Sequence, residues 1–224
     1  FRREYEIIRN LSGEGVVEAY ALEKDRGYLV MVLEDFGGMS LDRLLPSMTM
    51  DLRTFLNLAI KVAGALEMIH GQGVVHKDIN PSHIVWNPET SLVKIIDFGI
   101  AEILPPGKQA VRSPEVMEGT LAYMSPEQTG RMNRTVDHRT DLYSLGVTLY
   151  EMVTNRLPFV AGDALEMVHA HVARTPVPPH KINPEVPEMI SNIILKLMAK
   201  TVEERYQSAA GLKADLQQCL AQYQ

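Results

Sequence analysis

The sequence predicts an α+β fold in which a short region of mixed helix and strand precedes a long, mainly helical region. Two strand-like runs rich in Val, Leu and Tyr, residues 16–22 and 28–33, follow an opening helical segment. From residue 51 onward, apolar side chains recur at three- and four-residue steps, which is typical of amphipathic helices. Hydrophobic residues make up 46% and charged residues 22% of the 224 residues, as expected of a globular protein.

The opening region is expected to contain one helix and one pair of strands. Apolar residues at near-helical spacing predict the last turns of a helix over residues 1–11. The Ser- and Gly-containing residues 12–15 end this helix, and the polar residues 23–27 are expected to form the turn between the two strands. The Phe-Gly-Gly sequence at residues 36–38 predicts a hinge between two lobes.

Beyond the hinge, long helices are expected to alternate with loops and short strands. The helices are expected over residues 51–71, 138–154, 163–173, 187–200 and 208–220. Residues 142–153 are apolar on most faces, which predicts a helix buried on all sides. Short β-rich pieces are expected at residues 74–75, 84–86 and 93–96, and a loop rich in Pro and Gly over residues 104–130.

Charge and residue usage argue against several classes of protein. The net charge of −6 argues against nucleic-acid binding, which usually requires a basic surplus. The lone Cys219 cannot form an internal disulfide, and no apolar run approaches the roughly 18 residues of a membrane span. We therefore expect a cytoplasmic protein without a membrane segment. The five histidines at positions 70, 138, 169, 171 and 180 show no metal-ligand spacing and are expected on the surface or in the core.

The strongest functional signal is an ordered series of short motifs. His-Lys-Asp at residues 76–78 is followed by Asp-Phe-Gly at 97–99 and by Ser-Pro-Glu at 125–127. The series continues with an Asp-led helix start at 141–146 and with Glu-Arg-Tyr at 204–206. Protein kinases carry His-Arg-Asp, Asp-Phe-Gly and Ala-Pro-Glu in this order. Each motif alone is weak, but their joint order and spacing make coincidence improbable.

The chemistry of these motifs suits phosphoryl transfer, in which a site mainly positions groups and neutralises charge. Asp78 is expected to orient a substrate hydroxyl and accept its proton; an aspartate in a plain β-turn is the alternative. Asp97 follows a strand and is expected to supply a carboxylate oxygen, the type of ligand that Mg²⁺ prefers. Gly99 is expected to give the next loop backbone freedom at positive φ.

From about residue 1 to residue 220, the chain resembles the bacterial eukaryotic-like (Hanks-type) Ser/Thr protein kinases. Three strings are further similar to one subgroup of these kinases: Glu-Asp-Phe-Gly-Gly at residues 34–38, the string at 76–82, and Glu-Gln-Thr-Gly-Arg-Met-Asn at 127–133. In that subgroup, the kinase domain heads very large signalling proteins and is followed by an ATPase-like module and a sensor histidine kinase. The resemblance implies these fused modules and a Ser- or Thr-containing protein substrate as partners, and ATP with Mg²⁺ or Mn²⁺ as cofactors.

The resemblance also implies a protein kinase-like fold with an incomplete small lobe. Residues 1–36 would form the end of the family's C-helix, two strands and the hinge, and residues 37–224 the complete, mainly helical large lobe. No Gly-rich phosphate loop and no Val-Ala-Ile-Lys strand precede Phe1. The chain is therefore expected to be N-terminally truncated, and the fragment to bind ATP negligibly.

Several residues match the nucleotide-binding positions of the family. Glu4 matches the C-helix glutamate that pairs with a small-lobe lysine, and an ordinary solvated glutamate is an equal alternative. Leu33 resembles the gatekeeper, and Glu34 and Phe36 would offer hinge backbone groups to adenine. Val85 would lie under the adenine ring, although a plain core valine fits nearly as well.

Other matches concern the protein substrate and the support of the catalytic loop. Thr120 resembles the loop threonine that favours Ser/Thr over Tyr substrates. Glu127 and Arg205 match the family's buried ion pair, and Asp141 would brace the catalytic loop from the central helix.

The catalytic loop also departs from the family pattern. His83 stands where an asparagine offers its amide oxygen to the second Mg²⁺, so it indicates either a structural replacement with weakened metal binding or a switched metal preference. Asn80 stands where Ser/Thr kinases carry a lysine that contacts the γ-phosphate. Lys77 replaces the usual arginine and lacks its planar fork.

Three functions remain open from the sequence. The first is a Ser/Thr protein kinase, favoured by Asp78 and Asp97. The second is a pseudokinase that scaffolds or regulates fused signalling domains, favoured by Asn80 and His83. The third is a small-molecule kinase of the aminoglycoside-phosphotransferase type, against which Thr120 and the 125–127 motif argue.

Overall fold

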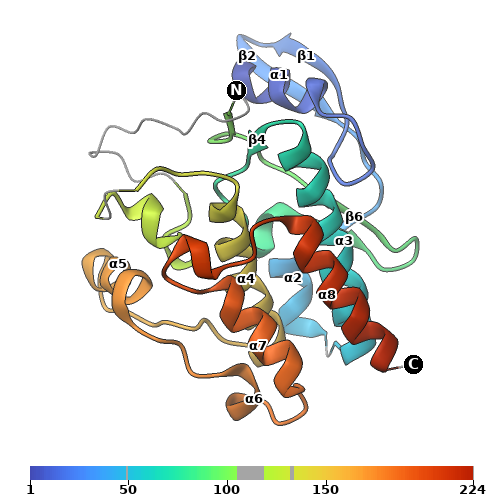
Figure 1. Ribbon diagram of the computed structural model, residues 1–224. Coiled ribbons are helices and arrows are strands. Elements are labelled where there is room, and N and C mark those ends of the chain that lie inside the picture. The colour runs from blue at the N-terminus through green and yellow to red at the C-terminus, as the bar shows by residue number, and fades with distance from the viewer. Residues whose placement is uncertain (49, 105–118, 132–133, 224) are drawn as a thin grey trace.

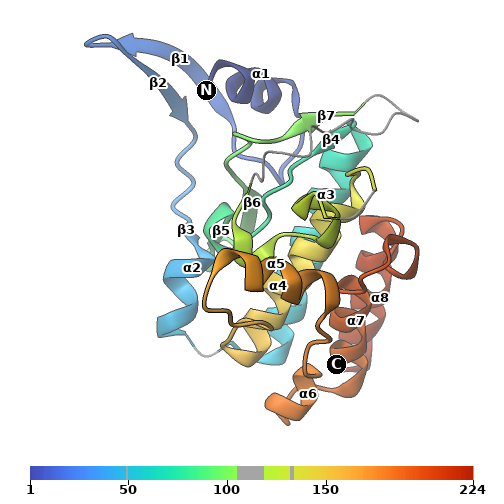
Figure 2. The same ribbon diagram turned by 90° about the vertical axis from the view of Figure 1, so that its left-hand side faces the viewer.

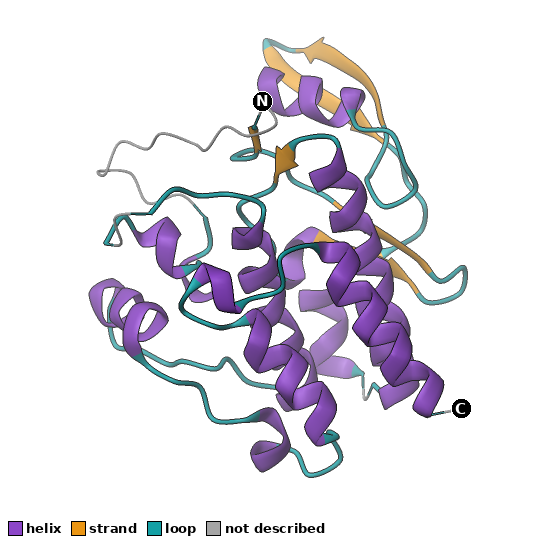
Figure 3. Cartoon of the chain, viewed as in Figure 1, coloured by secondary structure: helices purple, strands orange, loops and turns teal. Residues whose placement is uncertain are grey.

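The computed structural model describes residues 1–48, 50–104, 119–131 and 134–223. A small part, at the top of Figure 1, contains α1 (Arg2–Asn10), β1 (Ala19–Asp25) and β2 (Tyr28–Leu33). A larger, mainly helical part lies below it, as the colouring by secondary structure in Figure 3 shows. The α+β class predicted from the sequence is confirmed.

The larger part begins after the hinge and contains the remaining elements. Its helices are α2 (Leu41–Leu44), α3 (Leu52–Gly71), α4 (Arg139–Thr154), α5 (Ala164–Ala173), α6 (Pro179–Ile182), α7 (Glu188–Leu197) and α8 (Ala209–Gln222). Its strands are β3 (Met39–Ser40), β4 (Val74–Val75), β5 (Ile84–Asn87), β6 (Leu92–Ile95) and β7 (Glu102–Ile103). Short 3₁₀ helices are η1 (Leu45–Ser47), η2 (Pro81–His83), η3 (Leu121–Tyr123), η4 (Pro126–Thr129) and η5 (Val202–Glu204). Parts of the predicted 104–130 loop and of the 127–133 string lie outside the described residues.

The hairpin of β1 and β2 is longer than the sequence predicts. Its chain reversal is a two-residue turn at Arg26 and Gly27, whose φ angles are 47° and 90°, so β1 continues to Asp25 and the expected turn at residues 23–27 is wrong. Positive φ at both central residues is the geometry of a tight hairpin turn that matches the twist of the flanking strands.

The segment before β1 pairs with the larger part instead of extending the hairpin. Val16 forms a parallel bridge with Ile95 of β6, and the Val17 amide donates to the Ile95 carbonyl at 3.3 Å. The Ile95 amide in turn donates to the carbonyl of Gly15 at 2.8 Å. The predicted strand therefore starts at Ala19 and not at residue 16, because these backbone groups are already bonded to β6.

Helices α3 and α4 form the centre of the larger part. The carboxylate of Asp51 accepts the Thr54 amide at 2.9 Å, which caps α3 at its first turn. Residues 140–150 of α4 are buried without interruption, which confirms the predicted central helix. Gly146 allows this burial, because a Cβ there would lie 2.7 Å from the Cβ of Leu197 in α7. Figures 1 and 2 show α3 running beside α8, and α4 beside α7.

Two small sheets join these helices to the motif residues. Strands β3, β5 and β6 form one antiparallel sheet, and β4 pairs with β7. Within the described part of the chain, every helix is too short or too polar to cross a lipid bilayer.

Candidate active site

The β5–β6 hairpin brings the first two motifs together. The His-Lys-Asp loop lies between β4 and β5, and Asp97 follows β6. Ile84 pairs with Ile95, and just beyond this pair the Ile96 amide donates to the carbonyl of His83 at 3.0 Å. Residues distant in sequence thereby form one cluster, which lies beside the small part of the molecule.

Asp141 braces the loop of the His-Lys-Asp motif from the first turn of α4. Its carboxylate accepts the backbone amides of His76 at 2.9 Å and Lys77 at 2.7 Å. It also contacts His70 Nε2 of α3 at 2.8 Å. Burial alone would raise the pKa of Asp141, but the contact with His70 and the neighbouring imidazoles hold it below its usual value. These bonds hold Lys77 at φ 72°, a backbone conformation that few side chains adopt.

Asp78 is held by the segment that carries Thr120. The Thr120 amide donates to Asp78 Oδ1 at 2.7 Å. Gly119 permits this contact, since its φ is 110° and a Cβ there would lie 3.2 Å from the Lys77 carbonyl oxygen. Asp78 Oδ2 remains as the second carboxylate oxygen, 3.6 Å from His83 Nδ1.

Asn80 organises the loop through its side chain. Its Oδ1 accepts the Ser82 amide at 2.9 Å, which starts η2. Its Nδ2 donates to the Asp78 carbonyl at 3.0 Å and to Thr120 Oγ1 at 3.3 Å. The structure therefore places Asp78, Asn80 and Thr120 together, with the buried Asn80 as their link.

His83 lies between the two aspartates. Its Nδ1 is 2.8 Å from the Asp78 carbonyl oxygen, and its Nε2 is 3.3 Å from Asp97 Oδ2. Burial of the ring opposes protonation, but the hydrogen bonds to Asp97 and to the Asp78 carbonyl, with the two negative charges, raise the pKa of His83 above its ordinary value. An imidazole that carries a proton on the ring nitrogen facing Asp97 cannot use that nitrogen to bind a metal.

Asp97 presents an ionised carboxylate. The contact with His83 is the main reason that its pKa falls to about 2, and the Gly99 amide adds to this by donating to Oδ1 at 3.1 Å. Its side chain is 53% exposed. The positive φ expected at Gly99 is wrong: Asp97 itself has φ 64°. Glycine at position 99 instead lets the Asp97 carboxylate approach the backbone closely, because a Cβ there would lie 3.1 Å from Asp97 Oδ1.

Glu4 of α1 faces this cluster from the small part. Burial, and then the negative charge of Asp97, raise the pKa of Glu4. A glutamate in this position is stabilised by a nearby cation, which the lysine implied by the family resemblance would provide.

The hinge, residues 34–38, connects β2 to β3. Leu33 ends β2 with its side chain partly exposed. The ring of Phe36 and the methyl of Val85 crowd Gly38, where a Cβ would lie 2.6 and 2.7 Å from them. Within the described chain, the Phe36 amide and the Glu34 carbonyl have no hydrogen-bond partner, whereas the Phe36 carbonyl accepts from Asn87 Nδ2 at 2.8 Å.

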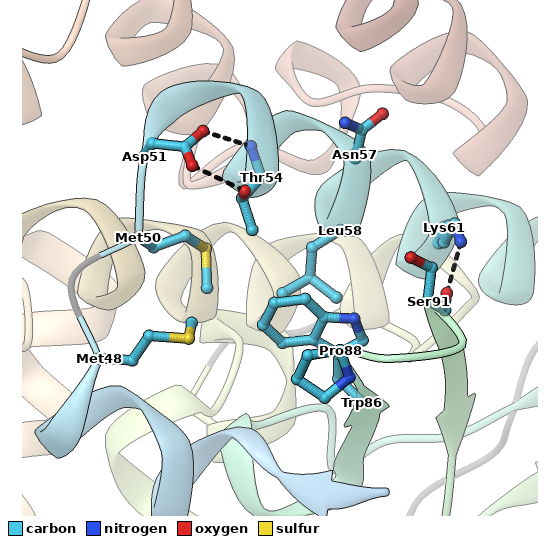
Figure 4. A pocket seen from close by; sticks show the side chains of 10 residues that line it. All are labelled: Met48, Met50, Asp51, Thr54, Asn57, Leu58, Lys61, Trp86, Pro88 and Ser91. Atoms are coloured by element: carbon cyan, nitrogen blue, oxygen red, sulfur yellow. Dashed lines mark hydrogen bonds between the residues drawn. The ribbon is translucent and has the colours of Figure 1, made fainter.

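A surface cavity of about 370 Å³ lies on the opposite side of β5 and contains none of the predicted site residues. Figure 4 shows its walls, formed by Met48, Met50 and Leu58 around Trp86. Trp86 is the neighbour of Val85 in β5, and successive side chains of a strand point to opposite faces. The cavity is thus separated from the predicted site by the sheet.

Residues outside the motifs make supporting contacts that the sequence does not predict. Gln128 Nε2 donates to the Lys77 carbonyl at 2.7 Å. This bond connects the chain just after the Ser-Pro-Glu motif to the loop of the His-Lys-Asp motif. His70 was expected to be a surface or core residue, and its contact with Asp141 gives it a supporting role. Neither contact can be predicted from a single sequence, because each depends on which helices and loops pack together.

The segment over residues 119–123 rests on a buried network that includes His171 of α5. Its Nδ1 lies 3.0 Å from the Tyr143 hydroxyl. Its Nε2 has no hydrogen bond of good geometry, although the ring interacts with the backbone of Ala122 and Leu121 in η3. Lys200 Nζ donates to the His171 carbonyl at 2.8 Å and so secures the end of α5.

His171 is expected to make the fold sensitive to acid. Burial, then the charge of Lys200, lower the pKa of His171 to about 4 from an ordinary 6.5. Between pH 6.5 and pH 4, His171 is protonated in the unfolded chain but neutral in the folded chain. The free energy of unfolding therefore falls as the pH is lowered through this window, by roughly 3 kcal/mol in total.

Urea unfolding between pH 7 and pH 4 measures this effect. The His171→Asn variant should lose less stability than the wild type over that range. His169→Asn, at an exposed position of the same helix, should behave like the wild type. Equal pH profiles for all three proteins would contradict the prediction.

Comparison with known proteins identifies the family. A model described as the protein kinase domain matches residues 1–219. The chain belongs to the protein kinase family. A probable serine/threonine-protein kinase of Clostridium perfringens is 34% identical over 220 residues, covering 97% of this chain and 31% of the relative.

Two other bacterial kinases are similar to the same extent. The serine/threonine-protein kinase PknB of Mycolicibacterium smegmatis is 34% identical over 221 residues, 96% of this chain and 35% of the relative. A probable serine/threonine-protein kinase of Streptomyces coelicolor is 35% identical over 228 residues, 98% of this chain and 33% of the relative. The kinase domain described above thus spans about a third of the length of these relatives, and the predicted protein kinase fold is confirmed.

Proposed function

We propose that this kinase domain transfers the γ-phosphate of ATP to Ser or Thr residues of a protein substrate. The observation that carries the proposal is the cluster of Asp78, Asn80, Thr120 and Asp97, held in place by Asp141. The relatives named as serine/threonine-protein kinases support the same activity.

The residues of the cluster fit a magnesium-bound nucleotide. Asp97 offers an exposed, ionised carboxylate, and Mg²⁺ takes one or two carboxylates together with phosphate oxygens and waters. No group of three or more His, Cys, Asp or Glu side chains in the described ranges could hold a metal by itself, which suits an ion held largely by the nucleotide. The free Phe36 amide and Glu34 carbonyl fit the donor and acceptor pattern of an adenine edge.

The residues of the cluster have separate roles in the proposed reaction. Bound ATP and Mg²⁺ would supply the phosphoryl group and neutralise its charge. Asp78, fixed through Oδ1 by the Thr120 amide, uses Oδ2 to orient the substrate hydroxyl and accept its proton. Thr120 joins the substrate loop to the catalytic loop through Asn80. Leu33 and Val85 line the adenine slot.

The family pattern also includes a phosphate-covering loop and a lysine that pairs with the glutamate at the position of Glu4, and residues 1–224 do not contain these two features. We also propose a cytoplasmic bacterial signalling protein, with ATPase-like and histidine kinase modules following in a two-component pathway. The strings at residues 34–38 and 76–82 support this subgroup.

The test is γ-phosphate transfer by the full-length protein to a Ser- and Thr-containing protein, with Mg²⁺ or Mn²⁺. Transfer above the background of the Asp78→Asn form, on Ser or Thr and not on Tyr, supports the kinase. Its absence with both metals would favour the alternative of a pseudokinase, for which the departures at His83 and Asn80 are the supporting observations.

Replacing His83 with Asn is expected to raise Mg²⁺-dependent transfer about tenfold. The amide oxygen is a hard ligand for Mg²⁺, whereas imidazole nitrogen suits softer metals. The measurement is kcat at saturating ATP over a range of Mg²⁺ concentrations. His169→Asn serves as the control, and an unchanged or lower rate in His83→Asn would show that the imidazole is the better residue here.

A further inference from the structure

A partly buried ion pair lies beside the hinge. Lys94 Nζ is 2.9 Å from Glu34 Oε1 and 2.6 Å from Oε2, so the contact is bidentate. The side chains of Lys94 and Glu34 are only 10% and 18% exposed, and the ammonium lies 5.5 Å from the centre of the Phe36 ring. Ion pairs add little net stability whether they are exposed or buried, because the loss of hydration offsets much of their attraction. Stability alone is therefore a weak explanation for the pair.

The carboxylate of Glu34 joins three segments of the chain. Its Oε2 accepts the Glu18 amide at 3.1 Å, and the Glu34 amide donates back to the Glu18 carbonyl at 2.9 Å. Lys94 anchors the same carboxylate to β6 of the larger part. One side chain thus links the approach to β1, the hinge and the large-lobe sheet.

The pair also shares a surface with the proposed adenine slot. Lys94 lies directly opposite Val85 in the β5–β6 ladder, and residues directly opposite one another in a ladder project from the same face of the sheet. Phe36 packs over that face next to Val85, as the crowding of Gly38 shows. The ion pair therefore stands at one wall of the space between the hinge backbone and Val85.

We propose that Glu34 and Lys94 are positioning residues that set the distance between the hinge backbone and Val85, and through it the affinity for a purine ring. The inference rests on the proposed function, because it assigns the purine to the hinge. Neither charged group needs to touch the nucleotide. Their effect passes through the hinge backbone, whose Phe36 amide and Glu34 carbonyl face the ligand.

The experiment compares variants of the full-length protein. Lys94→Met removes the pair but leaves the partly buried Glu34 charge without its partner, so the double variant Glu34→Gln with Lys94→Met removes both charges together. Both proteins should show a KM for ATP about tenfold higher with kcat within about twofold, as expected when binding is lost equally in ground and transition states. Lys94→Arg keeps the charge and should stay within about threefold of the wild-type KM.

A matched control is the ion pair of Lys213 and Glu67, at 3.0 Å on the surface between α8 and α3. Lys213→Met should leave the KM for ATP unchanged. Amide hydrogen exchange of residues 15–20 and 34–38 tests the same link without nucleotide: exchange should be faster in Lys94→Met and unchanged in Lys213→Met.

Two results would overturn the inference alone. The first is an unchanged KM for ATP and an unchanged exchange rate in the Lys94 and Glu34 variants of a protein that binds ATP. The second is a raised kcat at unchanged KM in these variants, which would show that the pair slows catalysis instead of supporting ATP binding. A wild-type protein that binds no ATP by calorimetry would instead overturn the proposed function, and the assignment of the purine with it.

Discussion

The Asp78→Asn variant of the full-length protein is expected to transfer phosphate about 1,000-fold more slowly than the wild type, within the range that a positioned acid–base group contributes. Asparagine keeps an oxygen for the Thr120 amide, so the local fold should persist. It carries no negative charge to accept the proton of the substrate hydroxyl. The loss should therefore appear in kcat, with the KM for ATP nearly unchanged.

Single-turnover transfer measures this loss, and the thermal midpoint of the variant shows whether it is folded. An Asp78→Asn protein that retains a tenth or more of the wild-type rate would remove Asp78 from the role of base. Loss of ATP binding in the variant would indicate a structural role for Asp78.

Arg205→Met is expected to lower the free energy of unfolding by about 3–5 kcal/mol, the cost of leaving a buried charge without its partner. Arg205 lies against Glu127 with two bonds of 2.6 and 2.8 Å, and both side chains are almost fully buried. Its Nε donates to the Ala199 carbonyl at 2.7 Å, and its guanidinium lies 4.9 Å from the Tyr143 ring. The substitution therefore leaves the Glu127 carboxylate without its charged partner. It also removes three hydrogen bonds to backbone carbonyls, those of Ala199, Arg139 and Lys200.

Urea unfolding of the kinase domain provides the measurement. Arg134→Met is the matched control, because Arg134 pairs with Glu203 at 2.6 Å on the exposed surface. That variant should keep nearly the wild-type midpoint, since exposed pairs contribute little. A double variant, Glu127→Gln with Arg205→Met, should be more stable than Arg205→Met alone. Equal midpoints for Arg205→Met and Arg134→Met would contradict the role assigned to the buried pair.

The sequence predicted most of the elements because their signals are local. Asp51 caps α3 and Asp163 caps α5, and both helices begin at the residue after the predicted start. The unbroken apolar run within α4 predicted its central position. The predicted start of the first strand was wrong because it depends on a partner strand. Val16 and Val17 pair with β6 and not with β2.

The candidate site was predictable to a similar extent. Motif order placed Asp78 and Asp97 in one site, because a series of matches at family spacing is informative even in one sequence. The link of Thr120 to Asp78, the contact of His70 with Asp141 and the pair of Glu34 with Lys94 were not predictable. Each joins elements far apart in sequence, and its formation depends on their packing.

The sequence by itself determined that this protein has a kinase domain and which acidic residues lead its motifs, since these follow from residue identity and order. Only the tertiary structure decided how the site is held: His83 lies between Asp78 and Asp97, Asp97 has a positive φ, and the partly buried pair of Glu34 and Lys94 ties the hinge to β6. The physical reason is that hydrogen bonds and ion pairs depend on distances between segments, which local propensity does not specify.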